Sequence, residues 1–236
     1  MPPGAAVHWF RKGLRVHDNP ALLAAAQAAA AAHAPLYPVF VLDPWFLHPS
    51  RVGTNRVQFL LQSLCCLNES LSRHDSRLLV LRGKPEEVLK HFIAAHSIQH
   101  LTFETDTEPY ARKRDIEVCR LAQQIGLTVS QHCSHTLWDQ EYLLAKNGGA
   151  VPKSYQSMLS LVKKSGPPPK PLPAPELGDL PPLPASMRIG ATQADGQYGV
   201  PNLAVLGYDP AEATAVIPGG EVEALRRMDA YLSNAR

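Results

Sequence analysis

The chain has 236 residues, of which 45% are hydrophobic and 19% charged, and its formal net charge at pH 7 is +2. This length suits one sizeable core with an appendage, because domains commonly run to roughly 100–200 residues. So small a net charge excludes a bulk electrostatic requirement for nucleic acid, and any basic surface must be local. No apolar run approaches the roughly 20 residues that span a bilayer, and the first residues lack the pattern of a secretion signal.

The four cysteines show neither paired CxxC spacing nor the framework of a small secreted domain. We therefore expect an intracellular, reducing location, either nucleus or cytoplasm. Cys65 and Cys66 fall within a helical pattern and are expected in the core, because a buried cysteine packs as a small hydrophobe.

The first informative stretch combines a strand, a basic loop and a helix start. Residues 7–10 form an apolar, aromatic run that predicts a buried strand, and a polar loop with several basic residues follows. Asp18 or Asn19 is expected to cap the next helix, with Pro20 in its first turn. Loops at the carboxyl ends of parallel strands line the ligand crevice of an open sheet, so this loop is a candidate site.

Strand and helix signals alternate through the first half of the chain. Further strands are predicted at 36–42, 78–81, 100–104 and 127–129. The helices between them are expected to begin near Thr54 or Asn55, near Pro85 and near Glu108, the last ending at Gly126. The pattern predicts an α/β fold, a doubly wound, Rossmann-like five-stranded parallel sheet with helices on both faces.

Past Trp138 the chain becomes rich in proline, which suits neither helix nor inner strand. We expect an extended connector with one short helix near 155–162, and an amphipathic helix after Gly219. The predicted division is an α/β domain over 1–140, a connector over 141–218 and, over 219–236, the first helix of a truncated further domain.

Several chemical signatures are absent from the sequence. It contains no GxGxxG fingerprint, no GxxxxGK[ST] phosphate loop and no GxSxG elbow. His132, Cys133 and His135 form a dense cluster, but no second pair completes four ligands, so we expect no metal site.

The loop after the fourth predicted strand allows two interpretations. In one, Asp106 or Thr107 caps the next helix and Glu108 favours its positive end. In the other, Asp106 and Glu108 face the same crevice as Arg11 and Asp43, where carboxylates accept hydrogen bonds from a polar heterocycle.

Residues 9–22, WFRKGLRVHDNPAL, resemble the opening signature of the cryptochrome/photolyase family. The stretches 51–56, 106–110 with 114–115, and 151–155 resemble further family motifs in the same order. The pair Lys12-Gly13 is similar to animal-type cryptochromes and (6-4) photolyases.

The resemblance implies an amino-terminal antenna domain that holds a deazaflavin or a folate, then a connector and a helical domain that binds FAD. It implies (6-4) photolyase activity, the light-driven repair of UV-damaged DNA, or alternatively a non-enzymatic cryptochrome photoreceptor and circadian regulator. The family's FAD site lies downstream of the position matching Arg236. We therefore expect this chain alone to lack FAD, catalytic residues, and DNA or signalling partners, and to have no membrane association. A third interpretation is a nucleotide-binding α/β domain without flavin chemistry.

The same resemblance implies six chromophore-contacting residues, with Phe40 packing on a flat ring, arginines binding acidic or carbonyl groups and carboxylates accepting from ring N–H groups. They are Arg11, Phe40, Asp43, Arg51, Asp106 and Glu108. Two alternatives stay open, namely that Arg11 forms an interdomain salt bridge and that Phe40 is plain sheet core.

Overall fold

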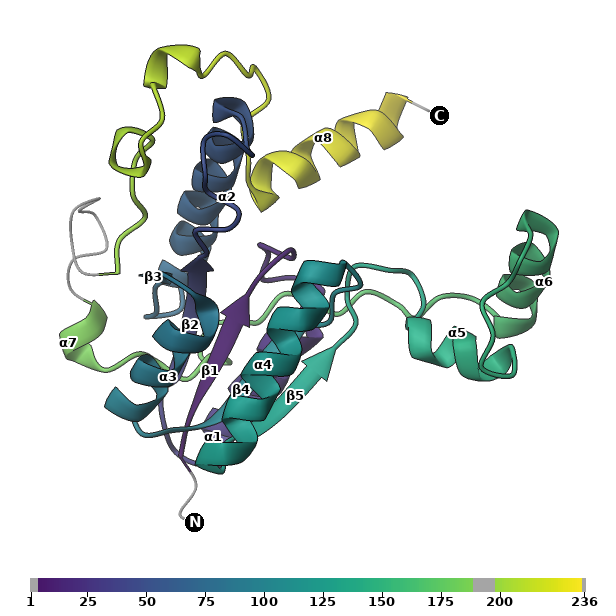
Figure 1. The fold of residues 1–236 in the computed structure, drawn as a ribbon, viewed down its shortest axis with the longest axis horizontal. Coiled ribbons are helices and arrows are strands. Elements are labelled where there is room, and N and C mark those ends of the chain that lie inside the picture. The colour runs from purple at the N-terminus through teal and green to yellow at the C-terminus, as the bar shows by residue number, and fades with distance from the viewer. Residues whose placement is uncertain (1–3, 189–197, 235–236) are drawn as a thin grey trace.

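The computed structural model describes residues 4–188 and 198–234. Its centre is a parallel sheet in the order β3-β2-β1-β4-β5. The strands are β1 (Ala5–Phe10), β2 (Leu36–Leu42), β3 (Leu79–Arg82), β4 (Ile98–Glu104) and β5 (Thr128–His132). This confirms the predicted five-stranded α/β fold. Since the strand order reverses between β1 and β4, a crevice is expected outside their carboxyl ends (Figure 1).

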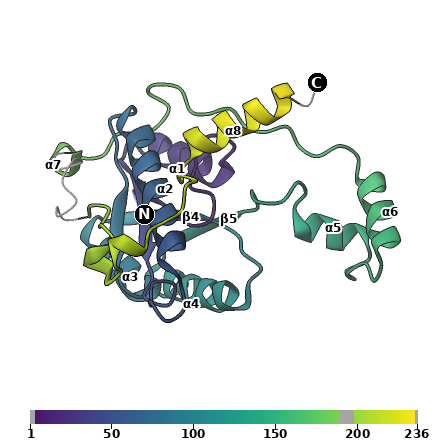
Figure 2. The same cartoon turned by 90° about the horizontal axis from the view of Figure 1, so that it is seen from above.

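Helices cover both faces of the sheet (Figure 2). The four main ones are α1 (Pro20–Ala31), α2 (Thr54–Ser72), α3 (Pro85–Ala95) and α4 (Pro109–Ile125). Alternate residues of β1 supply the two cores. Ala6 and Phe10 pack with α1 and α2, whereas Val7 and Trp9 pack with α3 and α4. Because both faces are covered, the strands are apolar throughout rather than alternating.

The predicted end of α4 is confirmed, and so is one of the two caps proposed for α1. The Asn19 side chain accepts a hydrogen bond from the Leu22 amide at 2.9 Å, and Pro20 lies in the first turn of α1. Gly126 closes α4 in the left-handed region at φ 70°, which a glycine adopts without strain.

The predicted cap of α2 is wrong. Gly53 precedes that helix and supplies no side chain. Thr54 donates to Glu212 instead, and the Asn55 side-chain oxygen accepts from the amides of residues 214 and 215. The polar groups of Thr54 and Asn55 therefore bond to residues much later in the chain instead of capping α2. Cys65, which we expected in the core, is exposed on α2, whereas Cys66 is partly buried.

A polar network lies inside the apolar core at His8. Its ring is fully buried, and its Nδ1 lies 2.9 Å from the Thr102 hydroxyl, which itself donates to the Ala21 carbonyl. Because the Thr102 hydroxyl donates its proton to Ala21, it can only accept from His8. His8 therefore donates from Nδ1 and keeps Nε2 as an acceptor facing Asn19. Burial lowers the His8 pKa to about 3, so the ring is neutral at physiological pH.

The proline-rich half contains more helix than the sequence predicts. Besides α6 (Tyr155–Ser165), the structure has α5 (Gln140–Lys146), α7 (Ala185–Arg188) and two 3-10 turns (Ala204–Leu206 and Pro210–Glu212). The segment also packs on the core, where Leu180, Leu183 and Tyr208 are buried. Beside β3, the Val80 amide donates to the Tyr198 carbonyl at 2.9 Å, so the chain partly covers an edge strand.

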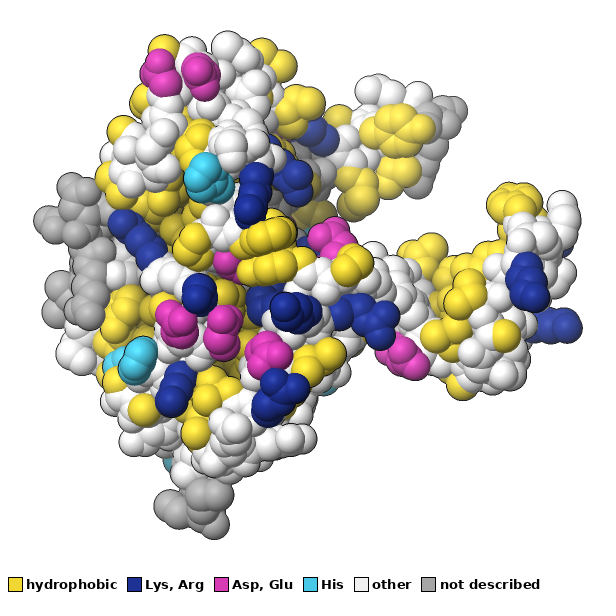
Figure 3. All heavy atoms as spheres, viewed as in Figure 1, with side chains coloured by type: hydrophobic (Ala, Val, Ile, Leu, Met, Phe, Trp, Pro, Cys, Tyr) yellow, Lys and Arg dark blue, Asp and Glu magenta, His cyan; other side chains and the backbone are white. Residues whose placement is uncertain are grey.

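Two parts extend from the α/β core, namely the arm formed by α5 and α6 and the helix α8 (Glu221–Asn234) (Figures 1 and 2). Apolar side chains are exposed on both (Figure 3). On α8 these include Val222, Leu225, Met228 and Leu232. Within 4–188 and 198–234, no helix is long and apolar enough to cross a membrane.

Candidate functional site

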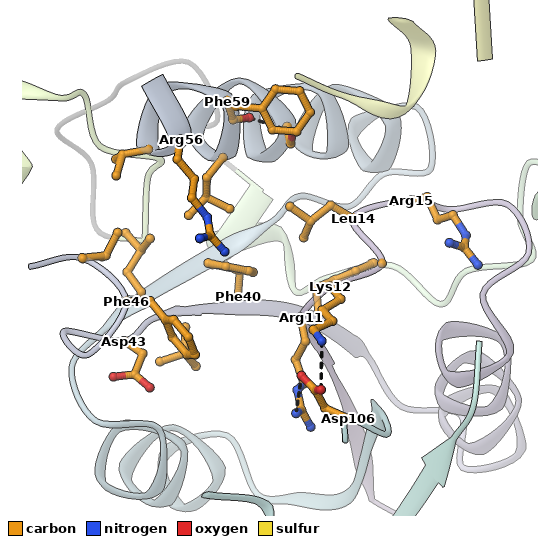
Figure 4. A pocket seen from close by; sticks show the side chains of 18 of the residues that line it. Arg11, Lys12, Leu14, Arg15, Phe40, Asp43, Phe46, Arg56, Phe59 and Asp106 are labelled. Atoms are coloured by element: carbon orange, nitrogen blue, oxygen red, sulfur yellow. Dashed lines mark hydrogen bonds and ion pairs between the residues drawn. The ribbon is translucent and has the colours of Figure 1, made fainter. Parts of the chain in front are cut away.

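A cleft of about 870 Å³ lies at the carboxyl ends of β1 and β2, beside the point between β1 and β4 where the strand order reverses, and α2 and the start of α8 form its far wall (Figure 4). Such a volume falls within the range of ligand sites. All six residues predicted from the sequence line it: Arg11, Phe40, Asp43, Arg51, Asp106 and Glu108. The structure thus brings together side chains from three strand ends, although their availability to a ligand differs.

Arg11 follows β1 and is committed to protein partners. Its side chain is 5% exposed, and Nη1 donates to the Asp115 carboxylate on α4 at 2.8 Å. Nη2 lies 3.9 Å from Asp106. Burial and the neighbouring Arg114 lower the Arg11 pKa, and the two carboxylates oppose that shift. The alternative left open for Arg11, an interdomain ion pair, is wrong, because its carboxylate partners lie inside the α/β core, where the pair closes the floor of the cleft.

Lys12 joins the two predicted carboxylates. Its ammonium donates to Asp106 at 2.9 Å and to Glu108 at 3.1 Å. Burial opposes ionisation of Asp106, yet the Lys12 ammonium and the Glu108 amide hold the pKa of that carboxyl below its usual value. Asp106 is nearly buried, whereas the Glu108 side chain is 59% exposed. Glu108 is therefore the carboxylate with free acceptor capacity toward a ligand.

Asp43 anchors an aromatic stack at the rim of the cleft. Its carboxylate accepts from the Tyr110 hydroxyl at 2.7 Å and from the Trp45 amide at 2.9 Å. Burial and Asp43 raise the Tyr110 pKa, so the phenol stays protonated. Trp45 stacks on Tyr110 with ring centroids 4.8 Å apart and planes 6° apart. The Arg51 guanidinium lies 3.9 Å from the Trp45 centroid, a cation–π distance.

The walls of the cleft are mainly apolar. Phe40 is 8% exposed and packs in the α1–α2 core, so it is both sheet core and cleft lining. The sequence prediction missed several other lining residues, which come from the loop after β2, the loop after β1 and the inner face of α2. They are Leu14, Trp45, Phe46, Val52, Arg56, Val57, Phe59 and Leu60. The aromatic pair after Asp43-Pro44 was the available signal for this wall.

The start of α8 is tied to the cleft. The Glu221 carboxylate accepts from the amides of Val16 at 3.0 Å and His17 at 3.2 Å, and it also pairs with the His17 ring. Gly220 has φ 124°, and a Cβ there would lie 2.6 Å from that of Cys66. Only a residue without a side chain allows α8 to begin this close to α2.

In the described part of the chain, the side chains of His132, Cys133 and His135 are not among any group of three or more His, Cys, Asp or Glu placed to hold a metal ion.

The order of the sheet and the cleft at its switch point define a doubly wound α/β domain with a candidate ligand site. A family profile described as DNA photolyase matches residues 6–176. The mouse protein Cryptochrome-1 is 41% identical over 229 residues, and the chicken protein Cryptochrome-1 is 40% identical over 230. The chain belongs to the cryptochrome/photolyase family.

Solved structures agree on the fold. A cryptochrome from Synechocystis superposes with a TM-score of 0.80 at 20% identity, covering 100% of this chain and 47% of that one. A class III photolyase from Agrobacterium tumefaciens gives 0.77 at 22% identity, covering 99% and 45%. An archaeal photolyase from Sulfolobus tokodaii, described with two FAD molecules and a novel light-harvesting cofactor, gives 0.67 at 20%, covering 97% and 45%.

The curated matches cover almost all of this chain but a minor part of the relatives. For each of the two animal proteins, the alignment takes 96% of this chain and 36% of the relative. The shared part is the α/β unit with its cleft and the segment that follows it.

Proposed function

We propose that the cleft binds a flat heteroaromatic chromophore, a deazaflavin or a folate, as the antenna domain of a blue-light flavoprotein. The observation that carries the proposal is that aromatic side chains, among them Phe40, Trp45 and Phe46, line one cleft together with an exposed carboxylate, Glu108. Aromatic faces favour a planar ring, and a carboxylate accepts its N–H or hydroxyl groups.

The polar residues of the cleft have different roles in holding such a ring. Glu108 accepts from the ring, and the hydrogen bond from Lys12 holds that carboxylate in place. Asp43 fixes Tyr110 and, through the Trp45 amide, the orientation of the stack. Arg11 and Asp106 set the charge beneath the ring rather than reaching out to it. When bound, such a chromophore supplies light absorption, whose energy a flavin elsewhere in the protein would use.

The photolyase from Sulfolobus tokodaii, with its light-harvesting cofactor, supports an antenna role for this fold, and its likeness to the chain is one of fold alone. For the whole protein, the animal cryptochromes among the relatives favour a photoreceptor or regulator. The match to the DNA photolyase profile supports photolyase activity as the second candidate, and the resemblance of Lys12-Gly13 to (6-4) photolyases favours that type. In either case we assign the binding of FAD, damaged DNA and signalling partners to the parts of the family's proteins that lie outside the matched region. We propose an intracellular location, nucleus or cytoplasm, for either candidate.

We also propose that α8 begins the helical domain and that residues 141–218 connect it to the α/β domain over 1–140. The exposed apolar side chains of α8 and its attachment at Glu221 support this division.

The test is an equilibrium titration of 8-hydroxy-5-deazaflavin, and separately of a reduced folate, into the 236-residue chain. We expect one of them to bind, and Glu108→Gln to weaken binding five- to tenfold because a charged acceptor is lost. Glu117→Gln removes a carboxylate from the outer surface of α4 and serves as the control, with affinity unchanged. No binding of either compound to the unmutated chain would overturn the proposal.

A further inference from the structure

The basic side chain of Arg56 lines the cleft and takes no part in the contacts described above. Arg56 lies in the first turn of α2, and its guanidinium points into the cleft toward Phe40 (Figure 4). Among the residues at 4–188 and 198–234, none forms a hydrogen bond or an ion pair with this guanidinium.

The carboxylates of the cleft cannot be counted as its partners, because each is engaged elsewhere. They are Asp43, Asp106, Glu108 and Glu221. None lies within ion-pair distance of Arg56, and much of the cleft wall around it is apolar. The other cation without a carboxylate, Arg51, is held over Trp45 at the rim.

Arg56 therefore presents a permanent positive charge and a fork of N–H donors to the interior of the cleft. A guanidinium stays protonated at any physiological pH, and its planar donors match the oxygens of a phosphate or a carboxylate in pairs. Such charge-assisted bonds are stronger than those between neutral groups. An anionic group on a ligand in the cleft would meet in Arg56 a cation that no described carboxylate neutralises.

We propose that Arg56 binds an anionic group, a phosphate or a carboxylate, at the end of the ligand's side chain. The ring lies toward Glu108 and the stack of Trp45 on Tyr110, and the side chain extends across Phe40 to α2. This inference rests on the proposed function and deepens it, because it specifies a heterocycle with an anionic tail over a neutral one.

A comparison of riboflavin with FMN measures what the anionic group adds to the affinity, because the two compounds share a ring and a ribityl chain and differ by a terminal phosphate. The flavin ring also has nearly the shape of a deazaflavin. Both are titrated into the unmutated chain, into Arg56→Gln and into Lys90→Gln, which removes an exposed charge from α3. We expect FMN to bind at least tenfold more tightly than riboflavin in the unmutated chain and in Lys90→Gln.

In Arg56→Gln the two affinities should agree within twofold, with riboflavin binding unchanged. Arg56 is exposed, so this variant should keep the thermal stability of the unmutated chain, which checks its folding. Equal affinities in the unmutated chain, or a preference for FMN that survives in Arg56→Gln, would overturn the inference while ring binding stands. Failure of both flavins to bind also overturns it, and the deazaflavin and folate titrations then decide whether the proposed function fails too.

Discussion

Replacing Asp115 by asparagine tests whether Arg11 is a structural charge beneath the cleft. The substitution keeps the shape of the side chain but removes its negative charge, which lies 2.8 Å from the Arg11 guanidinium. The Arg11 side chain is only 5% exposed. Removing one partner of a buried pair commonly costs about 3–5 kcal/mol, because the remaining charge is left uncompensated. Asp106 stays at 3.9 Å from Arg11, which places the expected loss of unfolding free energy near the low end, at about 3 kcal/mol.

Urea denaturation at pH 7 measures this loss, and a thermal melt should fall by about 6–12 °C for a protein of this size. The matched control is Glu117→Gln, which breaks an exposed pair with Arg120 on the same helix, with side chains 43% and 58% exposed. That control should change stability by no more than about 0.5 kcal/mol. A loss below about 1 kcal/mol in Asp115→Asn would refute the buried-pair account of Arg11.

Three further predictions follow from the same structure. The folded state holds His8 neutral with a pKa of about 3, so the unfolded state takes up the proton first as pH falls below 6.5. This single group should therefore remove about 2 kcal/mol of stability between pH 7 and pH 5. In urea denaturation, the loss of unfolding free energy over this pH range should be smaller by that amount in His8→Asn. Gly220→Ala should force a Cβ against Cys66 and speed tryptic cleavage within α8, whereas Gly148→Ala, also at positive φ but in open space, should leave that rate unchanged. FAD mixed with the Leu14→Trp variant, whose cleft is filled, should not co-elute at one equivalent in gel filtration, and stoichiometric FAD retained by that variant would contradict the division of cofactors proposed above.

The fold was predictable because its signals are local. The strands are continuous apolar runs, and Asn19 and Gly126 mark helix ends by their own chemistry. The helix α5 was missed because it buries none of its residues and so carries no apolar periodicity. The cap expected at Thr54 was wrong because its partner, Glu212, lies 158 residues further along the chain.

The candidate site was predictable in place but not in detail. Residues at strand ends converge in any doubly wound sheet, which is why Arg11, Asp43 and Asp106 meet in the cleft. Whether a charge there is free depends on partners from distant segments, such as Asp115 for Arg11. The orientation of Arg56 into the cleft likewise requires the packing of α2, which no local pattern specifies.

The central claim, that this cleft is where a flat chromophore binds, is tested most directly by filling it. Leu14 points into the cleft from the loop after β1, and a tryptophan at this position would occupy the space of a ring (Figure 4). In calorimetric titration with 8-hydroxy-5-deazaflavin or the reduced folate, whichever binds, we predict one equivalent for the unmutated chain and no detectable binding for Leu14→Trp, with both proteins folded by circular dichroism. Equal binding to the two proteins would contradict the account.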